Sequence, residues 1–138
     1  LPSADVLIMA AAPADFRVPD PAPRKIRKSA APTQLTLCPT PDILLSTLPA
    51  RRPGAVVVGF ALDAGGDAVS GGRHKLSAKS LDLVVVNDAS EPGAGFAVDT
   101  NRATLLSRDG SAEELPLMPK ADLAELILDR IERLLHER

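Results

Sequence analysis

Two groups of lysines and one aspartate are the residues of this sequence best suited to phosphate chemistry. One group is the basic run Lys25–Lys28 inside a proline-rich stretch, and the other is Lys75 with Lys79, four residues apart and able to share a helix face. Lysines at the carboxyl end of a strand can neutralise a triphosphate and stabilise charge that develops during phosphoryl or nucleotidyl transfer. Asp15 is a candidate ligand for Mg²⁺ or a cofactor. Solvated charge for the lysines, and a turn or cap for Asp15, are the competing interpretations.

Other familiar sites find no support in the sequence. There is no GxxxxGK[ST] phosphate loop, and neither the glycines at 65–72 nor those at 92–95 match GxGxxG after a strand. His74, His136 and Cys38 lack the spacing of a metal site. No serine or cysteine is paired with a histidine in a nucleophile motif, so hydrolase hypotheses rank low.

Length and composition predict one domain with an ordinary core. The 138 residues are 45% apolar, and 16 basic residues against 18 acidic ones give a net charge of -2. That balance gives no overall reason to expect a nucleic-acid or anionic membrane partner. No apolar run approaches the roughly 20 residues that span a bilayer. The single cysteine excludes an internal disulfide and fits a reducing compartment, so we expect a soluble, cytoplasmic protein.

Three continuous apolar runs rich in β-branched residues predict strands buried on both faces of a parallel sheet. Each run ends in polar residues, and ligands of open α/β sheets gather beyond the carboxyl ends of the strands. The runs are Val6–Ala10, Val56–Phe60 and Leu83–Val86, and the residues at their ends are 11–15, 60–63 and 87–88. The sequence therefore predicts an α/β fold with one crevice that gathers these side chains.

A proline-rich segment separates the first two runs. Residues 17–34 read RVPDPAPRKIRKSAAPTQ, and the four prolines forbid a continuous helix, which predicts an extended, exposed flap. The triplet Thr40-Pro41-Asp42 supplies an N-cap residue, a proline at the first helical position and a first-turn carboxylate. We therefore expect a helix that begins at about Thr40.

The second half has mixed signals. The glycine pairs at 65–66 and 71–72 are expected to bracket a weak helical segment ahead of the Lys75/Lys79 pair. Asp-Gly within Arg108–Ser111, between two apolar runs, predicts a β-hairpin. Residues 119–138 carry leucine and isoleucine at helical spacing, so an amphipathic helix is expected to pack on the sheet.

Six words of this sequence occur in the same order and with similar spacing in one protein family. They are MAAAPADFR (9–17), KIRK (25–28), TPDIL (40–44), VVGFALD (57–63), KLSAKSLDLVVVND (75–88) and GFAVDTNRATLLSRDG (95–110). Together they resemble the phosphopantothenoylcysteine synthetase domain of the bifunctional coenzyme A biosynthesis flavoprotein. Any one word is weak, but the set spans nearly the whole chain.

The resemblance implies a Rossmann-like ligase, usually a homodimer. Such a ligase activates the carboxylate of 4'-phosphopantothenate with CTP and Mg²⁺, and the amine of cysteine then displaces CMP from the acyl-cytidylate. A fused decarboxylase domain is a possible partner, and FMN is expected only if that domain is attached. Neither nucleic acid nor a membrane is implied.

Roles follow for the positions that match the family's words. Lys25 becomes the catalytic lysine of the flap, Asp15 a metal ligand, and Asn87 a supporting residue at a strand end. Phe60 is expected to contact the base, and Lys75 and Lys79 the phosphates. The full set of implied nucleotide-binding residues is Met9, Ala10, Ala11, Asp15, Lys25, Pro41, Asp42, Ile43, Leu44, Phe60, Lys75 and Lys79.

The sequence also departs from the family's pattern. The family's synthetase domain opens with a glycine-rich strand-loop-helix and an asparagine that have no counterpart here, so we expect residues 1–138 to be a single domain, the C-terminal part of such a synthetase domain. Two other functions stay open. One is a non-catalytic nucleotide-binding or dimerisation module of the same fold, and the other is a nucleic-acid binder that uses the run Arg24–Lys28.

Overall fold

A five-stranded mixed sheet forms the centre of the protein. The computed structural model describes residues 1–28, 34–63, 67–88 and 98–138. The strand order is β1-β4-β5-β7-β8, with bounds Val6–Met9, Val56–Asp63, Leu83–Asp88, Ala103–Ser107 and Ala112–Glu114. β1, β4 and β5 run parallel, whereas β7 and β8 are antiparallel to their neighbours. The predicted Rossmann-like α/β fold is confirmed, with an antiparallel edge added by the predicted hairpin.

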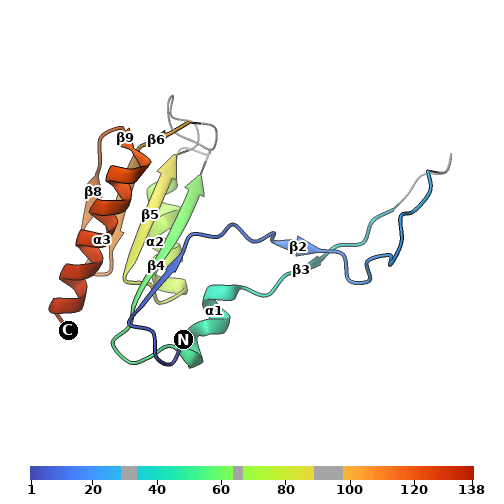
Figure 1. Cartoon of the computed structure of the whole chain (residues 1–138), viewed down its shortest axis with the longest axis horizontal. Helices are drawn as coiled ribbons and strands as arrows, with labels where there is room; N and C mark the ends of the chain where they lie inside the picture. The colour runs from blue at the N-terminus through green and yellow to red at the C-terminus, as the bar shows by residue number, and fades with distance from the viewer. Residues whose placement is uncertain (29–33, 64–66, 89–97) are drawn as a thin grey trace.

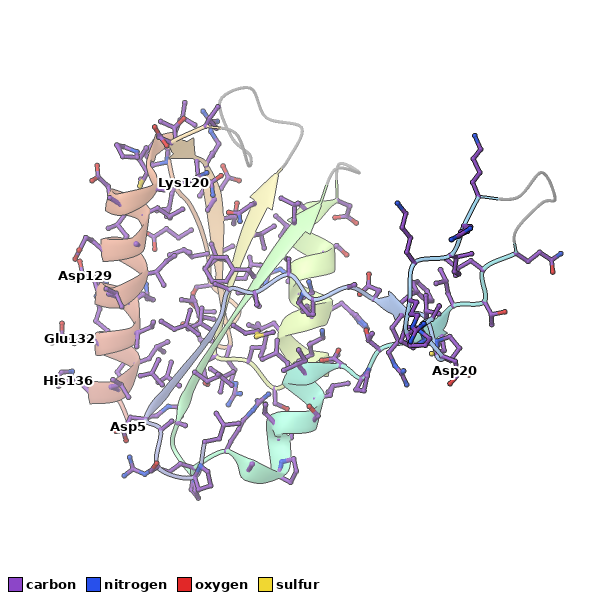
Figure 2. All side chains as sticks on the ribbon, turned by 45° about the vertical axis from the view of Figure 1, so that its right-hand side comes forward. Asp5, Asp20, Lys120, Asp129, Glu132 and His136 are labelled. Carbon is purple, nitrogen blue, oxygen red and sulfur yellow. The ribbon has the colours of Figure 1, made fainter. Side chains whose placement is uncertain are left out.

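One helix covers each face of this sheet (Figure 1). α3, Lys120–His136, buries Leu123, Ile127 and Ile131 against one face, as its helical spacing predicts. Its charged side opposes that stripe, and Figure 2 shows Asp129, Glu132 and His136 pointing away from the sheet. α2, Ala68–Ala78, packs on the other face over Val57, Val84 and Val86. The central strands are continuously apolar because both of their faces are covered.

The glycine pair at 71–72 lies inside α2, and the expectation that it would end a weak helical segment is wrong. Gly72 is buried where α2 crosses the sheet: a Cβ there would lie 2.6 Å from Val86 Cγ2 and 2.7 Å from Leu106 Cδ1. Glycine costs helix propensity, but here its missing side chain lets the helix approach the strands closely. Tertiary packing therefore overrides the local signal. Gly65, Gly66 and the glycines at 93–95 lie outside the described residues.

We keep the name flap for residues 17–34, and the described parts of this proline-rich segment are extended, as predicted. At its base β2, Phe16–Arg17, pairs antiparallel with β3, Cys38–Pro39. From this two-stranded base the described parts of the flap run away from the sheet (Figure 1), and Figure 2 marks its position by Asp20.

The remaining elements are short. α1 spans Ile43–Thr47 and continues into the 3₁₀ helix η1, Leu48–Ala50. β6, Thr100–Asn101, pairs with β9, Met118–Pro119, beside the start of α3. Within the described ranges, no helix is long and apolar enough to cross a membrane.

α1 begins later than predicted. Its N-cap is Asp42, whose side chain accepts a hydrogen bond from Leu45 N at 3.1 Å, so the expected start at Thr40 is wrong by two positions. The Thr40 hydroxyl donates instead to the carbonyl of Ala14, across the base of the flap. A tertiary partner thus takes the side chain that a local rule would assign to the cap.

Candidate functional site

An ion pair joins the end of α2 to the start of α1. Lys79 is the C-cap of α2, and its Nζ lies 2.7 Å from Asp42 Oδ2. The other carboxylate oxygen of Asp42 caps α1 through Leu45 N. The hydrogen bond from Lys79 is the largest cause that holds the pKa of Asp42 below its ordinary value of 3.8. Two residues that the sequence places in the nucleotide site are therefore in direct contact.

Lys75 lies one helical turn before Lys79 and reaches the central sheet. Its Nζ donates to the carbonyl of Phe60 in β4 at 3.3 Å, and its side chain is half-buried. Lys75 thus contacts β4 while Lys79 contacts α1, so both amines lie where α2 borders these two elements. A cationic pair in this position is suited to a polyphosphate.

The ring of Phe60 does not join the two lysines. Residues alternate between the faces of a strand, and Phe60 packs with Val56 and Val58 in the cluster beneath α3. The lysines belong to α2, on the opposite face. Only the backbone carbonyl of Phe60 meets Lys75. The ring of Phe60 is therefore not placed to contact a base that binds beside the two lysines.

The end of β1 supplies the next predicted residues. Met9 is the last residue of the strand, pairs in register with Gly59 of β4, and packs on the α2 side. Ala10 and Ala11 follow it and are exposed. An exposed backbone beyond the end of a parallel strand is open to a ligand in the crevice that the sequence predicts.

Thr40 ties the chain that leaves β1 to the chain that enters α1. Its amide donates to Asp15 O at 2.8 Å, and its hydroxyl bonds the preceding carbonyl, that of Ala14. Exposed Asp15 is thereby held next to the segment that leads into α1. The sequence reasoning missed this role of Thr40, because its partner lies far away along the chain.

The four residues at the start of α1 divide into two kinds. Pro41 and Ile43 are exposed, Asp42 pairs with Lys79, and Leu44 is buried under β4, where its Cδ1 would lie 3.6 Å from a Cβ on Gly59. Leu44 therefore anchors α1 to the core, while the residues before it remain open to solvent.

The structure does not gather two further predicted residues with this set. Lys25 is exposed and belongs to the flap, whose described parts run from the β2–β3 base away from the sheet (Figure 1). Asn87, near the end of β5, accepts a hydrogen bond from Asn101 Nδ2 at 2.9 Å, which links β5 to β6. In this structure the Asn87 side chain thus supports β6.

No ready-made metal cage appears in the part of the chain that the structure describes, since no three His, Cys, Asp or Glu side chains gather there. Mg²⁺ commonly binds proteins through one or two carboxylates and completes its octahedron with substrate phosphates and water. The single carboxylate of Asp15 fits that arrangement and would need a bound nucleotide to complete it.

A profile of the DNA/pantothenate metabolism flavoprotein C-terminal domain matches residues 1–135. The chain belongs to this family. Among curated relatives, the coenzyme A biosynthesis bifunctional protein CoaBC of Bacillus subtilis is 40% identical over 129 residues, which cover 94% of this chain and 31% of that protein. The corresponding protein of Escherichia coli is 37% identical over 130 residues, covering 92% of this chain and 32% of its own length. The resemblance found in the sequence is confirmed.

Another relative has a different name. A cysteine/cysteine sulfinic acid decarboxylase from an unknown prokaryotic organism is 33% identical over 132 residues, which cover 96% of this chain and 36% of that protein. The chain thus spans about a third of the length of the curated relatives that it matches.

Solved structures agree with the family. The C-terminal domain of a CoaBC protein superposes with a TM-score of 0.75 and 27% identity, over 99% of this chain and 57% of that one. A Cab2 mutant in complex with phosphopantothenate-cysteine has a TM-score of 0.55 at 17% identity, over 75% of this chain and 34% of that one. This second likeness shows the fold alone.

Proposed function

We propose that this chain is the nucleotide-binding part of a phosphopantothenate–cysteine ligase of coenzyme A biosynthesis. The observation that carries the proposal is the pair of α2 lysines: Lys79 on Asp42 at the start of α1, and Lys75 on the carbonyl of Phe60 at β4. Membership of the family and similarity to CoaBC proteins support the reaction class.

The proposed reaction has two steps. A carboxylate oxygen of 4'-phosphopantothenate attacks the α-phosphorus of CTP, and pyrophosphate leaves. The amine of cysteine then attacks the acyl carbon of the acyl-cytidylate, loses a proton and expels CMP. Charge grows on the phosphate oxygens in the first step, so cations held near the triphosphate accelerate it.

Each residue has a distinct task in this proposal. Lys75 and Lys79 neutralise the triphosphate, and Lys79 exchanges its carboxylate partner on Asp42 for phosphate oxygens. Asp15 would hold Mg²⁺ together with the nucleotide, and the ion would supply further charge stabilisation. Ala10 and Ala11 offer backbone groups beyond β1. Lys25 would act only after the flap approaches the strand ends.

The same proposal includes a cytoplasmic homodimer. Apolar side chains on the flap and beside it are exposed, among them Phe16 at 57%, Ile26 at 74% and Leu35 at 66%. Apolar surface of this kind is typical of protein contacts.

FMN would be required only by an attached decarboxylase domain.

A second function is favoured by one observation. Because a decarboxylase also contains a region similar to this chain, the fold could serve as a module that binds a nucleotide or a second copy without ligation. That module would lack selective use of CTP in amide formation.

Isothermal titration of the 138-residue chain with CTP, and then with ATP, both with Mg²⁺, tests the proposal. We expect selective binding of CTP and a weaker affinity in Lys79→Gln. Arg52→Gln is the matched control, because Arg52 pairs with Asp5 at the start of β1 and takes no part in the site. Equal affinity for CTP in wild type and Lys79→Gln would contradict the proposed phosphate contact, and binding of ATP alone would contradict the use of CTP.

A further inference from the structure

Arg51 forms hydrogen bonds with both of the helices that the Asp42–Lys79 ion pair joins. On the α1 side, its Nη2 donates to Leu44 O at 2.6 Å and its Nε to Thr47 Oγ1 at 3.1 Å. On the α2 side, its Nη1 donates to Lys79 O at 3.1 Å and to Ser80 O at 3.0 Å. One guanidinium therefore links two helices that are far apart in sequence.

This arrangement answers a requirement of helix ends. The last carbonyls of a helix have no partner within it, and an arginine near a C-terminus can satisfy them. The rigid, planar fork of a guanidinium presents five N–H donors in fixed directions, which lets it bond both helices at once. Ser80 contributes through its backbone at φ 50°, a left-handed turn that leads from α2 toward β5.

The link reaches the candidate site without any intervening residue. Arg51 bonds the backbone of Lys79, whose side chain pairs with Asp42, and it also bonds α1, whose N-cap is Asp42. Leu44 is fixed in the core, so α1 has a firm base on one side. The guanidinium spans the gap between α1 and the C-terminal end of α2.

We propose that Arg51 is a positioning residue that sets the separation of α1 and α2, and with it the place where Lys79 meets a phosphate. In this role Arg51 acts through the helix ends, which take four of its five N–H donors. The effect on phosphate binding rests on the proposed function, whereas the effect on the Asp42–Lys79 pair does not.

The matched variants are Arg51→Lys and Arg52→Lys. Lysine keeps the charge but carries a single ammonium group, which cannot reproduce the four bonds to both helices. Arg52 is the adjacent residue, and its ion pair with Asp5 involves neither α1 nor α2. Thr47→Val is a milder second variant, since it leaves the guanidinium in place and removes the hydroxyl that accepts from Nε and donates to Leu44 O.

The first measurement is a ¹³C NMR titration of the Asp42 carboxyl in the 138-residue chain. Because the bond from Lys79 is the main cause of the lowered pKa of Asp42, we expect that pKa to rise toward its ordinary value in Arg51→Lys. A smaller rise is expected in Thr47→Val and none in Arg52→Lys. Folded Arg51→Lys with the Asp42 titration of wild type would overturn the proposal, and if Arg51→Lys does not fold, an unchanged titration in Thr47→Val would do so.

The second measurement is CTP affinity by calorimetry with the same variants. We expect the Kd to rise about tenfold in Arg51→Lys, which corresponds to the loss of roughly one good charged hydrogen bond, and to stay unchanged in Arg52→Lys. If wild type binds no CTP, the proposed function fails, while the Asp42 titration still decides the role of Arg51.

Discussion

Lys79 Nζ lies 2.7 Å from Asp42 Oδ2, and this contact joins the C-terminus of α2 to the N-terminus of α1. Both side chains are partly exposed, at 24% for Lys79 and 33% for Asp42. A pair of this kind is held loosely enough to exchange partners. In the proposed site, Lys79 would exchange the carboxylate of Asp42 for a phosphate oxygen when a nucleotide binds.

The ion pair predicts an acid-dependent loss of stability. The pKa of Asp42 is lower in the folded protein than in the unfolded chain. Its contribution is therefore complete above the ordinary pKa of 3.8 and is lost as the pH falls through the folded pKa. Urea unfolding across this range should show wild type approaching Asp42→Asn as the pH falls.

The choice of Asn isolates the charge, because Asn caps a helix about as well as Asp. At neutral pH we expect Asp42→Asn to cost about 0.2–1 kcal/mol, as for a partly exposed pair. Asp42→Ala should cost roughly 1 kcal/mol more, because it also removes the cap on Leu45 N. A constant difference between wild type and Asp42→Asn at every pH would refute the role of the pair.

Gly72 predicts a sharp contrast between neighbouring positions. A methyl group at 72 would press on Val86 and Leu106, so Gly72→Ala should destabilise the protein by about 1–3 kcal/mol. Gly71 is helical but exposed, so Gly71→Ala should stabilise it by up to about 1 kcal/mol. Thermal unfolding of the two variants checks this, and a stabilised Gly72→Ala would show that α2 can move away from the sheet.

Asp82 predicts the largest effect of a single charged residue. This aspartate is only 3% exposed, accepts Val57 N at 2.8 Å, and pairs with Arg108 and Arg138. Both arginines are partly exposed, but Asp82→Ala also leaves the buried Val57 N–H without its acceptor, so it should cost about 1–3 kcal/mol in the free energy of unfolding.

The matched change for Asp82 is Asp5→Ala. Asp5 lies just before β1 (Figure 2) and forms an exposed pair with Arg52. We expect its loss to cost less than about 1 kcal/mol. Similar costs for both variants in chemical denaturation would mean that Asp82 is not a structural centre.

The flap lysine predicts a kinetic rather than a binding effect. In the full-length protein, Lys25→Ala should lower kcat by about 10²-fold, as when one preorganised donor is removed from a transition state, and leave the affinity for CTP nearly unchanged. Lys28→Ala, in the same exposed run, is the control with near-normal kcat. A large loss of affinity with unchanged kcat would disprove the role of Lys25.

The fold could be predicted where the pattern of the chain reports burial directly. Leu83–Val86 is continuously apolar because α2 and α3 cover its two faces, and the stripe of α3 matches its buried side. Gly72 was misleading because local propensity cannot report how closely a helix approaches a sheet. The pattern at Thr40 predicted the wrong start for α1, because the Thr40 hydroxyl bonds the carbonyl of Ala14 on the other side of the flap and does not cap the helix.

The site was predictable only in part, for a similar reason. Spacing and resemblance suggested Asp42 and Lys79 separately, but neither shows that the two form a pair. The resemblance assigned Phe60 a role but did not say on which face of the sheet its ring lies. The alternation of side chains along β4 places that ring under α3. Arg51 carries no local signal, since two of its four partners belong to the far end of α2.

The parallel pairing of β1 with β4 has a consequence for how the chain folds. Val6 meets Val56 only after the flap and α1 have been enclosed as one long loop, whereas the β7–β8 hairpin closes across a few residues. Contacts that close long loops form late, because their entropic cost precedes their reward. β1 is also an edge strand, bonded to β4 alone among the described strands. We therefore expect the β1–β4 contacts to form later than the β7–β8 hairpin, so that the segment carrying Met9 to Asp15 joins the candidate site late in folding.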